Sequence, residues 1–124
     1  MWSRGLAEAT TIILAKSLER RNASGAWNSG LFHLTAAGHT SWAGFARAIL
    51  EDYEALLDRP ADSDEFRGPL KAKRVVEITS AQYQTPARRP HNSVLSNAKV
   101  QDAFGIVMPD WRSQLRLAMQ DAIR

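Results

Sequence analysis

Hydrophobic residues follow a helical rhythm most clearly between Trp42 and Leu57. Counted from Trp42, apolar residues fall at offsets of 3, 4, 7, 8, 11, 14 and 15 positions, which makes a continuous stripe on one face of a helix. Thr40 or Ser41 comes just before this stretch, and either hydroxyl can accept a hydrogen bond from an N–H group of the first turn. The pattern therefore predicts an amphipathic helix with Trp42 on its apolar face.

Helical patterns also occur near both ends of the chain. Apolar residues lie close to helical spacing within residues 2–20, which indicates a first helix. Ser96 can cap a short helix that Gly105 stops, because glycine readily adopts the left-handed conformation found at helix ends. Asp110 can cap a last helix over residues 110–123, where its charge also complements the helix dipole.

Two other stretches have the features of strands. Residues 30–34 are short and apolar with an aromatic side chain, and residues 74–78 are β-branched and bounded by polar positions. Because a long helix separates them, the two strands would pair in parallel through a right-handed crossover. We therefore expect an α/β fold, a small helix-rich domain with a two-stranded parallel sheet. So thin a sheet needs helices, or a neighbouring domain, to cover it.

Length and composition narrow the class of protein. The 124 residues are enough for one small domain. The chain has no cysteine, which excludes a disulfide framework and a thiolate metal site. Its longest apolar stretch in the first helix, residues 12–15, is far shorter than the roughly 20 residues that a bilayer requires. The first four residues lack the build of a signal peptide, so we expect a cytoplasmic protein without a membrane partner.

Charge is distributed unevenly along the chain. Residues 1–66 carry six Lys and Arg against nine Asp and Glu, a net charge of −3, whereas residues 67–124 carry ten against four, a net charge of +6. A basic C-terminal half is compatible with an anionic partner. Composition alone favours a simpler explanation, a basic face in contact with solvent.

Several kinds of catalytic site are missing from the sequence. There is no Gly-x-Ser-x-Gly turn, no Gly-x-Gly-x-x-Gly after a strand, and no pair of histidines at helical spacing, which weighs against nucleophilic, dinucleotide and metal sites. Glu51 and Asp52 are adjacent carboxylates on the polar face of the predicted helix, and contact with solvent explains them better than acid–base chemistry. We therefore predict no catalytic, cofactor-binding or metal-binding residue.

A loop over residues 83–95 is the one stretch that combines several ligand-binding side chains. Two prolines stiffen this loop, which reduces the entropy lost when it becomes ordered. Between the prolines lie two arginines, whose guanidinium groups bind phosphate oxygens through forked N–H donors. A tyrosine, an asparagine and a serine add an aromatic face, hydroxyls and an amide. The predicted substrate-binding residues are Tyr83, Arg88, Arg89, Asn92 and Ser93.

This loop has two interpretations on its residues alone. It suits the rim of a cleft for a diphosphate-linked ligand. Equally, its arginines could pair with helix carboxylates such as Glu51 or Asp52 and serve only the surface.

Ordered matches along nearly the whole chain resemble a known family. The matching stretches are residues 2–14, 30–34 (GLFHL), 38–42 (GHTSW), 83–95 (YQTPARRPHNSVL), 104–105 and 108–112 (MPDWR). They resemble the C-terminal part of dTDP-4-dehydrorhamnose reductases, members of the extended short-chain dehydrogenase/reductase superfamily. The main departure is Gln84, where the family usually has proline.

The resemblance implies an activity for the parent enzyme. Such reductases use NADPH or NADH to reduce the 4-keto group of dTDP-6-deoxy-L-lyxo-4-hexulose, which gives dTDP-L-rhamnose for bacterial surface polysaccharide. They have an N-terminal Rossmann domain and a smaller C-terminal substrate domain, are often dimeric and are reported with Mg²⁺. Residues 1–124 would then be the single substrate-binding domain, with the helix of residues 1–21 packed on the Rossmann domain.

The family's catalytic motifs are not found in this sequence. Members carry a glycine-rich dinucleotide turn and a Tyr-x-x-x-Lys pair, in which the tyrosine donates a proton and the lysine lowers its pKa. Here Tyr53 and Tyr83 are followed four residues later by Leu57 and Ala87. We therefore expect the chain alone to bind no cofactor and catalyse nothing. Its expected partners are the Rossmann domain, a dTDP-sugar and a second copy that covers exposed apolar surface.

Two alternatives remain open. The chain could belong to another extended reductase or epimerase of sugar nucleotides, against which the TPARRP string of the loop argues. It could also be a small basic helical module on nucleic acid, since its isoelectric point is about 9.7. Asp102, Asp110 and Asp121 add negative charge to the helices that such a module would use, so we do not expect a nucleic-acid partner.

Overall fold

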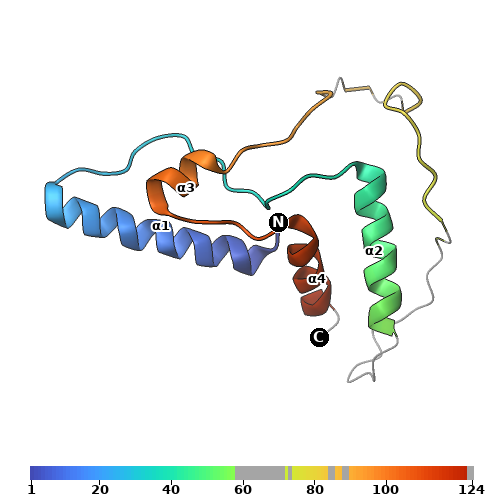
Figure 1. Ribbon diagram of the computed structural model, residues 1–124, viewed down its shortest axis with the longest axis horizontal. Helices are drawn as coiled ribbons and strands as arrows, with labels where there is room; N and C mark the ends of the chain where they lie inside the picture. The colour runs from blue at the N-terminus through green and yellow to red at the C-terminus, as the bar shows by residue number, and fades with distance from the viewer. Residues whose placement is uncertain (58–71, 73, 84–85, 88–89, 123–124) are drawn as a thin grey trace. The chain divides into compact units, whose positions relative to one another are not determined.

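The protein is helical in the part that the structure describes. The computed structural model describes residues 1–57, 72, 74–83, 86–87 and 90–122. Within these ranges the helices are α1 (Ser3–Ser24), α2 (Trp42–Leu57), α3 (Ala98–Phe104) and α4 (Trp111–Ala122) (Figure 1). The chain divides into two compact units, which we call the first unit (Met1–Gly38 with Leu95–Ala118) and the second unit (His39–Val94 with Met119–Arg124).

The predicted two-stranded sheet, and with it the α/β fold class, is wrong. Residues 30–34 and 74–78 form no strand, and the pairing found among the described residues is one isolated parallel bridge between Ala37 and Asp110. The two stretches belong to different units, so neither supplies the partner that a strand requires. A side chain takes the place of a neighbouring strand at Leu31, whose carbonyl accepts a hydrogen bond of 2.7 Å from Lys99 Nζ.

The helix predictions are confirmed, with shifted ends. α2 covers the predicted range, and Ser41 caps it, because the Gly44 N–H donates to Ser41 Oγ at 3.0 Å. α1 continues past residue 20 to Ser24 and ends at Gly25, whose φ of 69° lies in the left-handed region. No helix in the described part of the chain is long and apolar enough to cross a membrane.

The ends of α3 and α4 follow from single residues. Gly105 stops α3 as predicted, with a φ of 64° and a hydrogen bond of 2.7 Å from its N–H to the Gln101 carbonyl. The N-cap position of α3 belongs to Asn97, although the Ser96 hydroxyl accepts from the Ala98 N–H at 3.2 Å. Asp110 caps α4 as predicted, since its Oδ1 accepts the Arg112 N–H at 2.8 Å.

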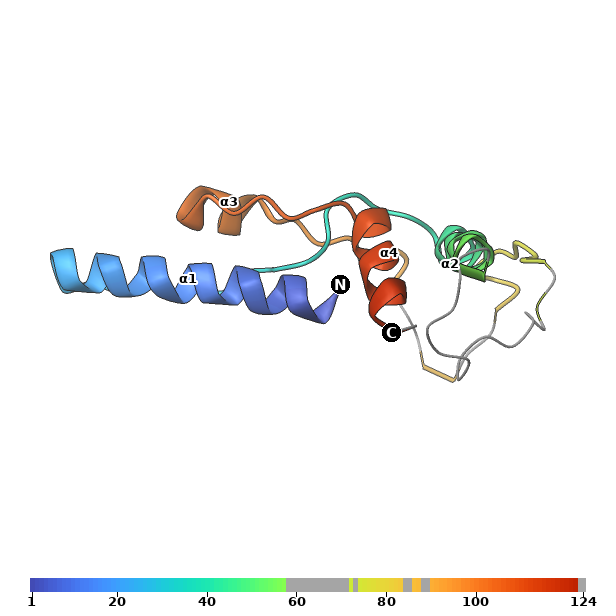
Figure 2. The same ribbon diagram turned by 90° about the horizontal axis from the view of Figure 1, so that it is seen from below.

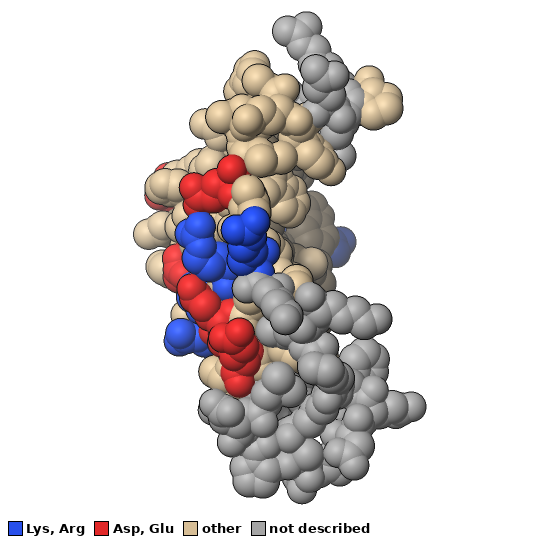
Figure 3. All heavy atoms as spheres, turned by 90° about the vertical axis from the view of Figure 1, so that its right-hand side faces the viewer, with Lys and Arg blue, Asp and Glu red and all other residues tan. Residues whose placement is uncertain are grey.

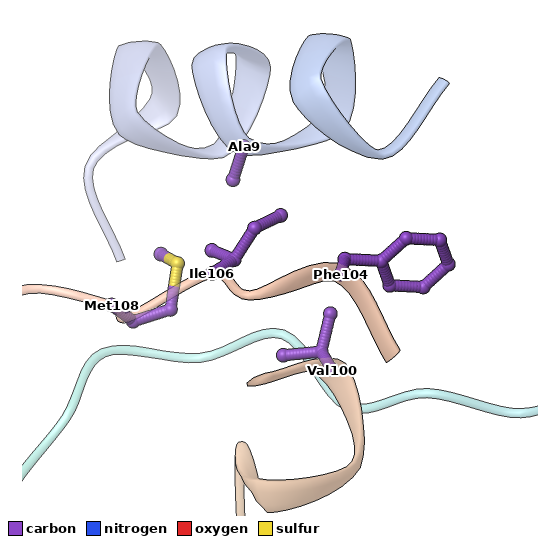
Figure 4. Packing of buried hydrophobic residues seen from close by; sticks show 5 residues of the cluster. All are labelled: Ala9, Val100, Phe104, Ile106 and Met108. Carbon is purple, nitrogen blue, oxygen red and sulfur yellow. The ribbon is translucent and has the colours of Figure 1, made fainter. Parts of the chain in front are cut away.

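A small apolar core holds the first unit together. α1 lies beside α3 (Figures 1 and 2). Ala9 of α1 points toward buried side chains of α3 and of the segment that comes directly after it (Figure 4). Phe32 packs edge-on against Phe104, with ring centroids 5.2 Å apart. Phe32 and Leu34 pack against this core, which explains why residues 30–34 are apolar. The buried members are Ala9, Val100, Phe104, Ile106 and Met108.

One buried glutamine joins the two ends of the first unit. Gln114 of α4 is 3% exposed. Its Oε1 accepts a hydrogen bond of 3.1 Å from the Trp2 N–H, and its Nε2 donates to the Pro109 carbonyl at 3.0 Å. The Pro109 carbonyl also accepts the Ala37 N–H at 2.9 Å. Gln114 thus links the backbone just before α1, at Trp2, to the backbone just before α4, at Pro109.

The second unit contains α2 and the segment that follows it. Ala48 and Asp52 are buried on α2, so the expectation that Asp52 lies in solvent is wrong, whereas Glu51 is exposed as expected. Arg47 of α2 forms an ion pair of 2.6 Å with Glu77. Positive and negative side chains alternate over this part of the surface (Figure 3). The polar face predicted for the helix is therefore a mixed-charge surface.

Candidate substrate-binding loop

The structure describes three of the five predicted substrate-binding residues. Tyr83, Asn92 and Ser93 are all exposed, Tyr83 at 64%. Arg88 and Arg89 lie outside the described residues, so their predicted contacts with phosphate or with Glu51 and Asp52 stay predictions. The structure therefore leaves the described part of the loop open to a ligand.

Local hydrogen bonds shape both ends of the loop. On the N-terminal side, the Gln82 N–H donates to the Thr79 carbonyl at 3.0 Å, and the Thr79 N–H donates to Gln82 Oε1 at 2.8 Å. These two bonds form a tight turn just before Tyr83. On the C-terminal side, Asn92 Oδ1 accepts the Val94 N–H at 2.9 Å, a turn that asparagine commonly makes with its own backbone. The side-chain oxygen of Asn92 thus has a structural role in the loop.

Asn97 fixes the chain where it leaves the loop. The Thr35 N–H donates to Asn97 Oδ1 at 3.0 Å, and Asn97 Nδ2 donates to the Thr35 carbonyl at 2.9 Å. This side chain therefore occupies both hydrogen-bonding groups of one backbone residue, as a neighbouring strand would. Asn97 was not among the predicted residues. It occupies the N-cap position of α3, but its side chain makes no cap hydrogen bond there, so a capping pattern could not have predicted its bonds to Thr35.

Trp42 is placed differently from its prediction. Periodicity assigns it to the apolar face of α2, but its side chain is 83% exposed. Its ring meets the Phe45 ring edge-on, with centroids 6.5 Å apart. Trp42 and Tyr83 are both in the second unit and are more exposed than Trp27 of the first unit, which is 48% exposed. Among its described residues the second unit therefore presents two accessible aromatic side chains, Trp42 and Tyr83, of which only Tyr83 was predicted to bind the ligand.

A comparison with known families agrees with the predicted resemblance. The family described as RmlD substrate binding domain matches residues 1–123. The chain therefore belongs to this family of substrate-binding domains.

Three relatives share the name dTDP-4-dehydrorhamnose reductase. The protein from Burkholderia thailandensis is 43% identical over 122 residues, which are 98% of this chain and 38% of the relative. The protein from Sinorhizobium fredii is 37% identical over 70% of this chain and 25% of the relative. The Escherichia coli K12 protein is 39% identical over 68% of this chain and 25% of the relative. The chain thus spans well under half the length of these relatives, and the predicted family is confirmed.

Proposed function

We propose that the chain is the substrate-side domain of a reductase that converts dTDP-4-dehydrorhamnose to dTDP-L-rhamnose. The match of residues 1–123 to the RmlD substrate binding domain family carries this proposal. The names of the relatives supply the substrate class. The same match favours a reductase over the small nucleic-acid-binding module that the basic composition also allowed.

The hydride chemistry belongs to another part of the enzyme in this proposal. NADPH or NADH supplies the hydride in such reductases, and a glycine-rich turn and a Tyr-x-x-x-Lys pair, both missing from this sequence, normally hold the cofactor and donate the proton. An N-terminal Rossmann domain would supply these parts, together with any Mg²⁺. This chain would bind the sugar nucleotide, and the enzyme would act in the cytoplasm.

The outer face of α1 is the surface we assign to that second domain. The inner face of α1 is covered within the first unit, since Ala9 and Ser17 are buried and Ile13 packs against the core. On the outer face, Leu14 and Leu18 are 55% and 47% exposed. Exposed leucines one helical turn apart form an apolar surface that a partner can cover. Without the second domain, two copies of the chain could cover it by self-association.

The loop at 83–95 supplies the proposed contacts with the ligand. Its arginines, Arg88 and Arg89, would bind the diphosphate through charge-assisted hydrogen bonds. Tyr83, Asn92 and Ser93 are exposed and would bind the sugar or the base through hydroxyl, amide and aromatic groups. The Thr79–Gln82 turn before the loop and the Asn92–Val94 turn near its end support the proposal. They limit the backbone conformations next to Tyr83 and at Asn92.

Calorimetric titration of the chain with dTDP tests this assignment. A hydrogen bond to a charged group contributes about 1.5–3 kcal/mol, so Arg88→Ala and Arg89→Ala should each raise the Kd about 10- to 150-fold. Arg20→Ala is the matched control, because Arg20 is exposed in α1 and bonds to Asn28. Unchanged affinity in both loop variants would refute the role of the arginines.

A further inference from the structure

Trp42 is exposed to a degree that packing does not explain. Its side chain is 83% exposed at the first position of α2, while Ala48 and Asp52 are buried further along the helix. Its ring meets the Phe45 ring in a T-shaped contact, with centroids 6.5 Å apart, and such a contact covers at most one face of the indole. Tryptophan is enriched where proteins bind partners, because its large ring contributes much contact area.

Tyr83 follows a segment that contacts the first half of α2, in the same unit as Trp42. The Arg47–Glu77 ion pair of 2.6 Å, formed at the surface, joins the segment of residues 74–83 to α2. Arg47 is five residues after Trp42, which is roughly 7.5 Å along a helix. From Glu77 the chain enters the Thr79–Gln82 turn, and Tyr83 follows it.

We propose that Trp42 is a stacking platform for the nucleobase of the nucleotide sugar. The inference rests on the proposed function and adds to it a residue outside the predicted loop. A pyrimidine base presents a flat π-face, and stacking on an exposed aromatic ring needs no particular hydrogen-bond pattern. Tyr83, which is also exposed among the described residues of this unit, would meet the same ligand. The base would thus lie at the start of α2.

Titration with dTDP in a calorimeter tests the platform directly. Loss of one base-stacking contact should raise the Kd of Trp42→Ala about 5- to 150-fold. Trp42→Phe keeps a stacking ring and should recover most of the affinity. Trp27→Ala is the control, because Trp27 is 48% exposed but lies in the first unit under Arg21, whose guanidinium carbon is 5.1 Å from its ring centroid. The control should bind dTDP as the unaltered chain does.

Each outcome of this experiment has one meaning. Equal dTDP affinity for Trp42→Ala and the unaltered chain would overturn the platform and leave the proposed function in place. Equal weakening in Trp42→Ala and Trp42→Phe, together with a lower melting temperature in both, would also overturn it, because the effect would then come from the fold. A complete lack of dTDP binding by the unaltered chain would overturn the proposed function itself and the platform with it. The titrated chain carries no second domain, so a change in its affinity for dTDP cannot come from altered docking of that domain.

Discussion

Replacement of Gln114 by alanine should destabilise the first unit more than any exposed substitution. The change removes two hydrogen bonds, from the Trp2 N–H and to the Pro109 carbonyl, at a side chain that is 3% exposed. The Pro109 carbonyl keeps its bond from the Ala37 N–H, but the part-buried Trp2 N–H loses this acceptor. A hydrogen bond contributes about 0.5–1.5 kcal/mol, and an unsatisfied buried group costs about 1–3 kcal/mol. We therefore expect the free energy of unfolding to fall by about 2–4 kcal/mol.

Urea unfolding followed by tryptophan fluorescence measures this loss. Natural domains are stable by about 5–15 kcal/mol, and urea slopes are about 1–3 kcal/mol per M, so the midpoint should fall by about 1–2 M. Gln101→Ala is the matched control, because Gln101 is exposed and contributes only backbone bonds to α3. Its midpoint should barely move.

A second variant separates the two hydrogen bonds of Gln114. Gln114→Glu keeps an acceptor for the Trp2 N–H but places a carboxylate oxygen against the Pro109 carbonyl. Burial and this repulsion raise the pKa of the introduced carboxyl in the folded state, so its protonation favours folding. Relative to the unaltered chain, this variant should regain stability as the pH falls through the raised folded-state pKa. Equal stability of Gln114→Ala, Gln101→Ala and the unaltered chain would refute the reasoning.

Three further predictions concern the fold and the chemistry. Gly38→Ala should destabilise the chain by about 1–3 kcal/mol, since its φ is 74° and a Cβ would lie 2.3 Å from Asp110 Oδ2, whereas Gly25→Ala, with a φ of 69° and open space, should cost less in the same thermal melt. Asn97→Ala loses both bonds to Thr35 and should cost about 1–3 kcal/mol in urea unfolding. Asn92→Ala, which loses one exposed turn bond, is its control, and equal midpoints would count against the Asn97 anchor. NADPH oxidation by the isolated chain with dTDP-4-dehydrorhamnose should be undetectable, and measurable turnover would contradict the assignment of catalysis to another domain.

The helices could be predicted from the sequence because their determinants are local. The stripe of α2 repeats over four turns, and Gly105 ends α3 with a conformation that its residue type favours. Trp42 could not be placed in the same way. Periodicity gives the face on which a side chain lies, but whether anything covers that face depends on residues distant in sequence.

The two strand predictions were wrong, and the role of Gln114 was not predicted, for the same physical reason: both depend on contacts between residues distant in sequence. A strand exists only when a second strand pairs with it, and the residues at 30–34 instead meet Lys99 and the core. Gln114 contacts Trp2 across 112 positions of sequence, a separation at which residue patterns carry no signal. The loop at 83–95 was found through residue types and resemblance, while its turns at Gln82 and Asn92 came from the structure.

The most direct measurement is a pair of calorimetric titrations of the isolated chain, one with dTDP and one with NADPH. A substrate-side domain should bind dTDP saturably with one site per chain and give no binding heat with NADPH. The account would be contradicted by an absence of dTDP binding, or by binding of NADPH to a chain that lacks the dinucleotide turn.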